Sequence, residues 1–334
     1  MVQSLCEAKF SFSKKGAARM NPLVSIIIAN YNRAHLIEET LDSIKNQSYT
    51  FFECIIVDDG STDNSVNVVQ NWIQGDERFQ FFKRPKSIRK GANACRNWGF
   101  KEKSKGDLIK FFDSDDIMLK DHIKISVEQI IEEELDFVVV DCQNFDENGL
   151  RERPYETNKN YVNITPIEFA KFQNAWITND LMLKKEWAFR IEFNEHIREV
   201  ASEYQYGIKL LLLTHNGILI PDILTHRRIH SGSFIVNMDA DDVVRVFNIA
   251  ETKLFTAMYL KDIAPENLIR WFIAGYMRLT FELARKRIIH NSVIKSFPLT
   301  IRTFGLFKTS VFFIGIASGF FLKKGYNIVK YARQ

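Results

Sequence analysis

Three acidic side chains stand close together where an apolar run of the chain ends. Asp113, Asp115 and Asp116 follow residues 108–112, a short apolar run with the pattern of a buried strand. Carboxylate oxygens are the ligands that divalent cations such as Mg²⁺ and Mn²⁺ prefer in proteins. Because an open α/β sheet binds its ligands beyond the carboxyl ends of its strands, we expect a cation site here.

A second acidic loop follows an earlier apolar run. Asp58 and Asp59 come directly after residues 51–57, and the carboxyl ends of parallel strands meet at one edge of a sheet. Five carboxylates gathered there would repel one another, so either a metal or a basic ligand group is implied. Taken alone, the DxD of Asp113 and Asp115 would more commonly be a helix cap or a solvated turn than a metal site. Two acidic strand-end loops in one α/β unit raise the odds of a metal site.

Apolar runs and amphipathic helices alternate through the first 140 residues. This alternation predicts an α/β fold with a doubly wound, mostly parallel (mixed) sheet flanked by helices. Strands are expected at residues 24–29, 51–57, 79–82, 108–112 and 137–140.

The alternation weakens beyond residue 150. Residues 151–160 are polar and rich in turn formers, which is typical of a mobile loop near an active site. Residues 217–229 are predicted to form two short strands that are broken at Pro221. From about residue 239 the pattern is helical.

Composition is that of a globular protein. The 334 residues carry a formal net charge of +4, which gives no argument for nucleic-acid binding, and we expect none. The four cysteines are widely spaced, which favours reduced thiols. We expect a disordered extension at 1–20, a catalytic domain at 21–235 with halves at 21–118 and 119–235, and a helical region at 236–334.

Four segments together resemble the motifs of a known enzyme family. Residues 24–33, 56–63, 91–97 and 106–116 are similar to those of family 2 glycosyltransferases with the GT-A fold, of the inverting, DxD-containing, bacterial surface-polysaccharide type. The resemblance extends over about residues 23–230. It implies a nucleotide-sugar donor and a divalent metal, Mn²⁺ or Mg²⁺.

The resemblance also assigns donor-binding residues. Asp59 would accept a hydrogen bond from the imide of an uncharged base, and Tyr31 would stack on it. Lys90 and Arg96 would neutralise the diphosphate, or else lie on the solvated face of a helix. The positions implied for the nucleotide are Ala29, Tyr31, Arg33, Asp58, Asp59, Lys90, Arg96 and Asp113.

Metal ligands are implied at the third loop and near residue 230. The resemblance assigns the metal to Asp115, Asp113 and His230, with Asp116 as a further contributor. Asp115 is expected to be the direct ligand. The alternative for His230 is a structural histidine. Arg228 could meet a phosphate.

The resemblance places a general base at the start of a later helix. In residues 202–211, Glu203 occupies the position of the family's base, whereas Ser202 replaces the usual first acid. Because of that departure, Glu199 and Glu195 remain alternatives. Another alternative is that Glu203 is only an exposed acid at the start of a helix, with no catalytic role.

These features predict a metal-dependent, inverting hexosyl- or N-acetylhexosaminyl-transferase. Its donor is expected to be a UDP-sugar, and its acceptor a hydroxyl of a glycan or lipid-linked acceptor in surface polysaccharide synthesis. The alternatives are a phosphoryl-transfer enzyme that uses the DxD, and a catalytically silent nucleotide-binding or membrane-docking protein.

The C-terminal region combines aromatic bulk with positive charge. Residues 309–322 contain no charge and are flanked by Lys308, Lys323 and Lys324, which suits a helix lying on an anionic membrane surface. We therefore expect peripheral contact through 300–324, on the cytoplasmic face of the cytoplasmic membrane. The alternatives are packing on the catalytic domain or an oligomer contact, and the oligomeric state stays open.

Overall fold

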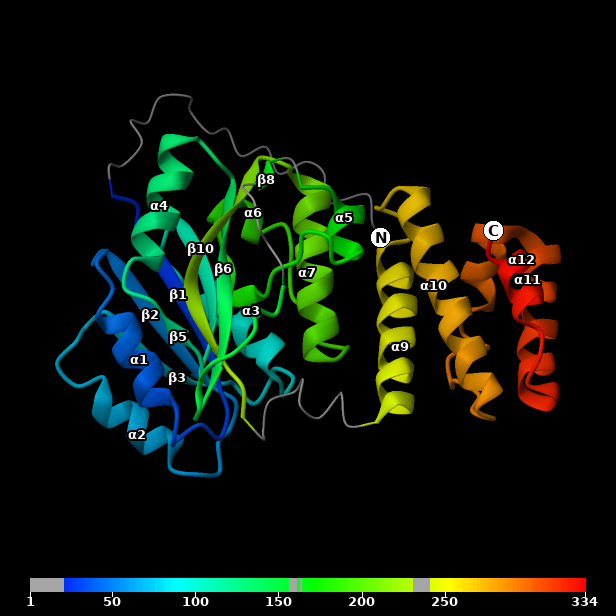
Figure 1. Cartoon of the computed structure of the whole chain (residues 1–334). Coiled ribbons are helices and arrows are strands. Elements are labelled where there is room, and N and C mark those ends of the chain that lie inside the picture. Colours follow the sequence, from blue (N-terminus) through cyan, green and yellow to red (C-terminus); the bar gives the residue numbers. More distant parts are fainter. Residues whose placement is uncertain (1–20, 156–160, 163, 231–240) are drawn as a thin grey trace.

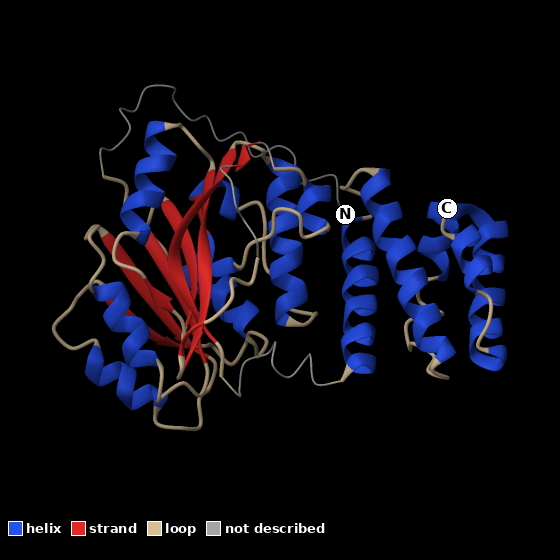
Figure 2. Ribbon diagram, in the orientation of Figure 1, coloured by secondary structure: helices blue, strands red, loops and turns tan. Residues whose placement is uncertain are grey.

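The structure is a computed structural model that describes residues 21–155, 161–162, 164–230 and 241–334 (Figure 1). The expected extension at 1–20, and residues 156–160 of the expected mobile loop, lie outside these ranges. A mixed α/β unit occupies one side of the molecule, and the C-terminal helices stand beside it (Figure 2).

One ten-stranded sheet forms the centre of the α/β unit. Its main path runs β3-β2-β1-β4-β9-β6-β10-β5, with β7 paired to β6 and β8 paired to β10. The strands are β1 (Val24–Asn30), β2 (Phe52–Asp58), β3 (Phe79–Lys83), β4 (Leu108–Asp113), β5 (Ile117–Met118), β6 (Phe137–Asp146), β7 (Gly149–Leu150), β8 (Tyr161–Val162), β9 (Leu181–Lys184) and β10 (Gly217–Arg228).

Helices cover both faces of the sheet and then form the C-terminal region (Figure 2). They are α1 (Ile37–Lys45), α2 (Ser65–Trp72), α3 (Ala92–Lys103), α4 (His122–Glu132), α5 (Pro166–Ala170), the 3₁₀ helix η1 (Thr178–Asp180), α6 (Lys185–Ala188), α7 (Glu199–Leu213), α9 (Asp242–Leu260), α10 (Glu266–Arg285), α11 (Phe297–Leu322) and α12 (Tyr326–Ala332).

Neighbouring parallel strands bring the acidic loops together. β1 pairs in parallel with β2 and with β4, so that Asn30 lies opposite Asp58 and Ala29 lies opposite Asp113. These strands are almost wholly buried, as their continuous apolar runs require. Their carboxyl ends therefore share one edge of the sheet, as predicted.

Two strand predictions are corrected by the structure. Residues 217–228 form one strand, β10, and not two strands broken at Pro221. The pairing with β6 instead shifts register between Leu219 and Thr225, and the exposed Pro221 sits in that irregularity, where its missing N–H costs no ladder bond. β6 also continues to Asp146, beyond the predicted end at residue 140.

The C-terminal helices share a hydrophobic core with the sheet. One cluster of buried side chains extends from Ile27 and Phe111 through Tyr206 to Leu254 and Phe272. The predicted fold class, a mixed and mostly parallel sheet with helices and a helical C-terminal extension, is confirmed. The division into domains stays a prediction.

The cysteines that the structure describes are buried and form no disulfide. Cys54, Cys95 and Cys142 are free thiols, and burial raises the pKa of each. Cys6 lies outside the described residues.

Candidate active site

Asp58 fixes the shape of the second loop. Its carboxylate accepts hydrogen bonds from the Asn30 side chain (3.0 Å) and from the backbone N–H groups of Gly60 (3.0 Å) and Ser61 (2.9 Å). Gly60 has a φ of 85°, a conformation that glycine adopts without strain. Asp58 is therefore fully engaged in holding the loop that carries Asp59.

Asp59 is paired with an arginine that the sequence did not single out. Arg84 Nε donates to Asp59 Oδ1 at 2.5 Å, and both side chains are largely buried. Arg84 also donates to the carbonyl of Ile88 at 2.6 Å, which holds the start of the 83–91 connection beside the second loop. In the sequence, the only sign that Arg84 could pair with Asp59 was its place in a basic segment, residues 83–86, after the third predicted strand.

Tyr31 and Lys90 form a pair at the mouth of the first loop. Tyr31 is 40% exposed, and Lys90 Nζ lies 4.2 Å from the centroid of its ring. The preceding Ala29 is half-buried. These three predicted donor-binding residues are thus within reach of a ligand, whereas Arg33 turns toward the third loop.

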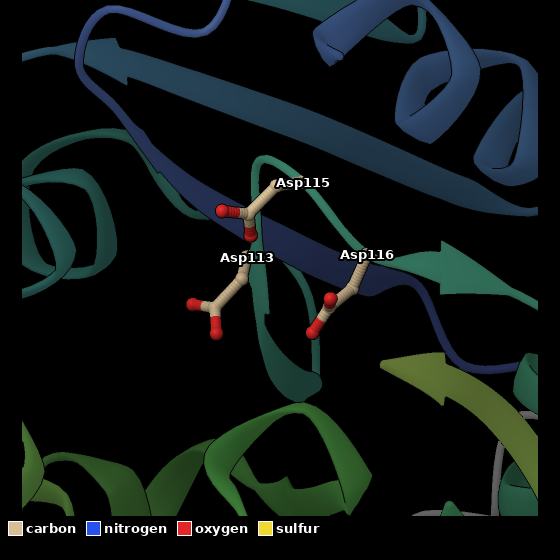
Figure 3. Close-up of side chains that lie close together, drawn as sticks. All are labelled: Asp113, Asp115 and Asp116. Atoms are coloured by element: carbon tan, nitrogen blue, oxygen red, sulfur yellow. The ribbon is translucent and has the colours of Figure 1, made fainter. Parts of the chain in front are cut away.

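The third loop gathers the predicted metal ligands. Carboxylate oxygens of Asp113, at the end of β4, and of Asp115 and Asp116, on the turn that follows, all lie within 4.8 Å of one another (Figure 3). His230 Nε2 lies 3.2 Å from Asp115 Oδ2, and Arg33 Nε lies 2.9 Å from the same oxygen. A histidine and three carboxylates form a donor set that suits Mg²⁺ or Mn²⁺.

Two carboxylates of this cluster have opposite pKa shifts. Burial raises the pKa of Asp116 well above its usual value, and the charges of Asp115 and Asp113 add to that rise. Burial would also raise the pKa of Asp115, but hydrogen bonds and charge from His230 and Arg33 hold it below its usual value. The partners of Asp115 therefore stabilise its ionised form, whereas the surroundings of Asp116 oppose ionisation.

Asn179 is a site residue that sequence reasoning missed. It lies in η1, and its side-chain oxygen accepts from the backbone N–H of Asp113 at 3.0 Å, while its amide nitrogen donates to Asp116 at 2.5 Å. The backbone N–H of Arg228 donates to the other oxygen of Asp116 at 2.7 Å. No local pattern marks Asn179, because its role depends on the chain returning beside β4.

Arg96 connects the acidic cluster to the candidate base. Its guanidinium donates to Asp113 at 2.5 Å and lies 3.4 Å from a carboxylate oxygen of Glu203. The side chain is only 2% exposed, so the alternative of a solvated helix face is wrong. Arg96 reaches both partners because α3 packs against β1 and β2.

The other candidate bases lie differently. Glu195 accepts a hydrogen bond from the side chain of Asn97 at 2.8 Å, and the side chain of Glu199 lies outside the part that the structure describes. Ser202 accepts from the backbone N–H of Asn194 at 2.7 Å and is buried. Among the candidate bases whose side chains the structure describes, Glu203 is the one that Arg96 connects to the acidic cluster.

Arginines of the chain itself offset the charge of the acidic loops. Arg84, Arg96 and Arg33 pair with Asp59, Asp113 and Asp115 respectively. The expectation that repulsion alone would demand a metal or a basic ligand is therefore weakened. The case for a metal rests on the donor set and its spacing.

Comparison with known proteins identifies the domain that carries this site. The model of the family described as Glycosyl transferase family 2 matches residues 25–185. The chain contains a family 2 glycosyltransferase domain. The glycosyltransferase predicted from the sequence motifs is thereby confirmed.

Curated relatives of this glycosyltransferase cover different shares of it. GlyG of Streptococcus pneumoniae serotype 4 is 28% identical over 247 residues, which are 69% of this chain and 79% of GlyG. An uncharacterized glycosyltransferase of Haemophilus influenzae is 42% identical over 103 residues, 31% of this chain and 40% of the relative. A GalNAc(5)-diNAcBac-PP-undecaprenol beta-1,3-glucosyltransferase of Campylobacter jejuni is 36% identical over 98 residues, 29% of this chain and 31% of the relative.

Solved structures show the same fold. S. aureus TarS 1-349 superposes with a TM-score of 0.61 at 18% identity, over 93% of this glycosyltransferase and 86% of that chain. TarS has also been solved with UDP-GlcNAc. A mannosyltransferase of Pyrobaculum calidifontis, solved with GDP-Man and Mn²⁺, gives a TM-score of 0.53 at 16% identity, over 93% of this chain and 92% of that chain.

Proposed function

We propose that this chain is a metal-dependent, inverting glycosyltransferase with a UDP-sugar donor. The observation that carries the proposal is the placement of Glu203 and the Asp113, Asp115 and Asp116 cluster on two sides of one buried arginine, Arg96. Such an arrangement sets a group that can accept a proton beside a group that can hold a metal.

The donor end of the site is formed by the first two loops. Tyr31 offers an exposed ring on which a base can stack, and Asp59 is held by Arg84 at the edge of the same loops. Lys90 lies over the Tyr31 ring and is free to swing toward a diphosphate, since the structure describes no ion pair for it. The choice of UDP is supported by the UDP-GlcNAc complex of the TarS neighbour.

The metal end would be held by Asp115, with Asp113 and His230 as further ligands. The pKa of Asp115 is held below its usual value. His230 Nε2 lies 3.2 Å from its carboxylate, and an oxygen of Asp113 lies within 4.8 Å. A divalent cation at this point supplies charge that stabilises a diphosphate leaving group. The Mn²⁺ complex of the mannosyltransferase neighbour supports such a cation.

The proton of the acceptor hydroxyl would pass to Glu203. An inverting transfer by direct displacement needs one general base, and a positioned carboxylate supplies it. The acceptor would be a hydroxyl of a glycan or lipid-linked acceptor in surface polysaccharide synthesis. The name of the Campylobacter relative, which includes an undecaprenol-linked glycan, supports a lipid-linked acceptor. We also propose that the enzyme works at the cytoplasmic face of the membrane, through residues 300–324.

Thermal-shift titration tests the donor and the metal together. We expect UDP with Mn²⁺ or Mg²⁺ to raise the melting temperature, and EDTA to remove most of that rise, because a cation held by Asp115 would neutralise the charge of the diphosphate. Asp115→Asn should abolish the metal-dependent part and leave the ligand-free melting temperature close to that of the wild type. An undiminished shift in EDTA, or in Asp115→Asn, would remove the metal from the proposal.

A further inference from the structure

The second half of α11 presents an apolar stripe to solvent. Gly305 has a φ of 82° and kinks the helix, so that residues 306–322 form a separate straight segment. Phe307, Ile314 and Phe321 are 69%, 60% and 73% exposed. Because they are seven residues apart, they lie on one face of the helix.

The opposite face of this segment is packed against the protein. Phe312 and Ile316 are buried, and α11 contacts both α10 and α12. A Cβ atom at Gly319 would lie 2.8 Å from the Phe281 ring, which shows how closely α11 and α10 approach. The helix has the length and composition to cross a membrane, and 28% of its most apolar window is buried. Its packed face makes it an outer helix of the bundle, and the exposed Leu306 and Leu322 add to the bare apolar surface.

Cations line a hollow at the C-terminal end of the stripe. The hollow has a volume of about 430 Å³ and includes Arg285, Lys323 and Lys324, and no carboxylate lies among its lining residues. For these three cations the structure describes no ion pair and no side-chain hydrogen bond. We call this group the basic hollow.

A neighbouring hollow extends the positive surface. It has a volume of about 510 Å³ and shares Arg285 and Lys323 with the basic hollow. Its carboxylates are already engaged with other cations, since Asp242 pairs with Arg245 and Glu282 lies 3.5 Å from Arg278. The shared cations therefore keep their charge available for a ligand.

We propose that the basic hollow binds the phosphate headgroup of an anionic membrane lipid while the stripe enters the adjoining apolar layer. Phe321 and Leu322 are 73% and 66% exposed, and they directly precede Lys323 and Lys324. Apolar bulk next to cations is the arrangement that an anionic lipid surface matches. A free phosphate ion would satisfy the cations but leave the apolar side chains in water.

A second copy of the chain fits this surface less well. Lys308 lies next to Phe307 at the start of the stripe, and Lys323 and Lys324 stand just after α11. Two copies joined along the stripe would place like charges opposite one another in either the parallel or the antiparallel arrangement. Anionic headgroups meet positive charge at both ends instead.

This inference rests on the proposed membrane contact and adds the headgroup site. Co-sedimentation of the full chain with vesicles tests the membrane contact and the headgroup site. One kind of vesicle contains phosphatidylcholine alone, and the other also contains phosphatidylglycerol. We expect the wild type to prefer the anionic vesicles. The variant Arg285→Gln/Lys323→Gln/Lys324→Gln should lose about 100-fold in affinity for them, because each cation near an anionic surface contributes about fivefold.

Matched variants separate the contributions. Lys120→Gln/Lys171→Gln/Lys261→Gln removes the same charge from exposed positions elsewhere and should keep most of the preference. Phe307→Ser/Phe321→Ser should weaken binding to both kinds of vesicle. Binding of UDP should be unchanged in every variant, which shows that the fold is intact.

The possible results are distinguishable. If the basic-hollow variant binds anionic vesicles as the wild type does, the headgroup site is refuted while the membrane contact stands. If the wild type binds neither vesicle, the membrane contact fails as well. If inorganic phosphate displaces the wild type fully at constant ionic strength, a lipid is the wrong occupant. The same holds if Phe307→Ser/Phe321→Ser changes the oligomeric state without changing vesicle binding.

Discussion

At the scale of single residues, Arg96 decides how the candidate site is assembled. It is almost fully buried, and it lies between Asp113 of the acidic cluster and Glu203 of α7. A buried arginine that lost one carboxylate would be left with uncompensated charge, which is costly. The arginine therefore ties the positions of the metal-side carboxylate and the candidate base to each other.

Replacing the candidate base by its amide separates binding from transfer. We expect Glu203→Gln to keep the UDP-induced rise in melting temperature but to lower the release of UDP from the donor by about 100-fold or more, because the amide cannot take up the acceptor proton. Initial rates with the UDP-sugar that gives the largest thermal shift measure the effect.

Glu195→Gln is the matched control, since Glu195 bonds to Asn97 and not to Arg96. It should retain most of the rate. If instead Glu195→Gln abolishes transfer and Glu203→Gln does not, the base is Glu195.

At the scale of elements, α3 carries Arg96 into the site because a glycine lets it lie close to the sheet. A Cβ atom at Gly99 would lie 2.9 Å from a methyl group of Ile27 on β1 and 3.0 Å from one of Val57 on β2. The absence of a side chain is required here for packing. The backbone angle at Gly99 is that of an ordinary helix, since no positive φ is recorded there.

Adding bulk at this contact should move α3 away from the sheet. We expect Gly99→Val to lower the free energy of unfolding by about 1–3 kcal/mol, the usual cost of overpacking. It should also reduce donor turnover, because Arg96 would shift relative to Asp113. Urea unfolding and UDP release measure the two effects.

Glu102→Val tests the same helix at an exposed position. This variant places the same β-branched side chain in α3 without a steric clash. It should therefore lower the free energy of unfolding much less than Gly99→Val does, and it should leave turnover intact. Equal losses in both variants would show that close packing of Gly99 against the sheet does not explain the effect.

At the scale of the whole molecule, the sheet and the C-terminal helices share one core. Side chains from Ile27 in β1 to Leu254 in α9 belong to the same buried cluster. A buried hydrogen bond from Gln205 of α7 to Thr256 of α9, at 3.2 Å, crosses between the two regions. The helices are therefore part of the folded unit that supports α7 and Glu203.

A cavity in α9 should destabilise the entire chain. We expect Leu254→Ala to lower the free energy of unfolding by about 2–5 kcal/mol, since Leu254 is fully buried. The transition should stay single, with circular dichroism and tryptophan fluorescence changing together.

Val244→Ala in the same helix is the control, because Val244 is 43% exposed and should cost little. Two separate transitions, with only the second sensitive to Leu254→Ala, would show that the C-terminal helices unfold independently of the sheet.

The sequence by itself determined the strands at residues 24–29, 51–57, 79–82 and 108–112, their alternation with helices, and the edge at which the acidic loops meet. These features follow from local patterns, because apolar runs such as residues 24–29 and 108–112 define buried strands, and parallel strands end at a common edge. The motifs that contain Asp59 and Asp115 are also local patterns, and they were enough to identify the family.

Only the tertiary structure decided which side chains face one another across that edge. Arg84 with Asp59, Arg96 with Glu203, and Asn179 with Asp116 join residues 25, 107 and 63 positions apart. The exposed stripe of α11 likewise depends on which face α10 and α12 cover. Such contacts arise from helix packing and from the return of distant segments to the sheet, and local hydrophobic periodicity carries no information about either.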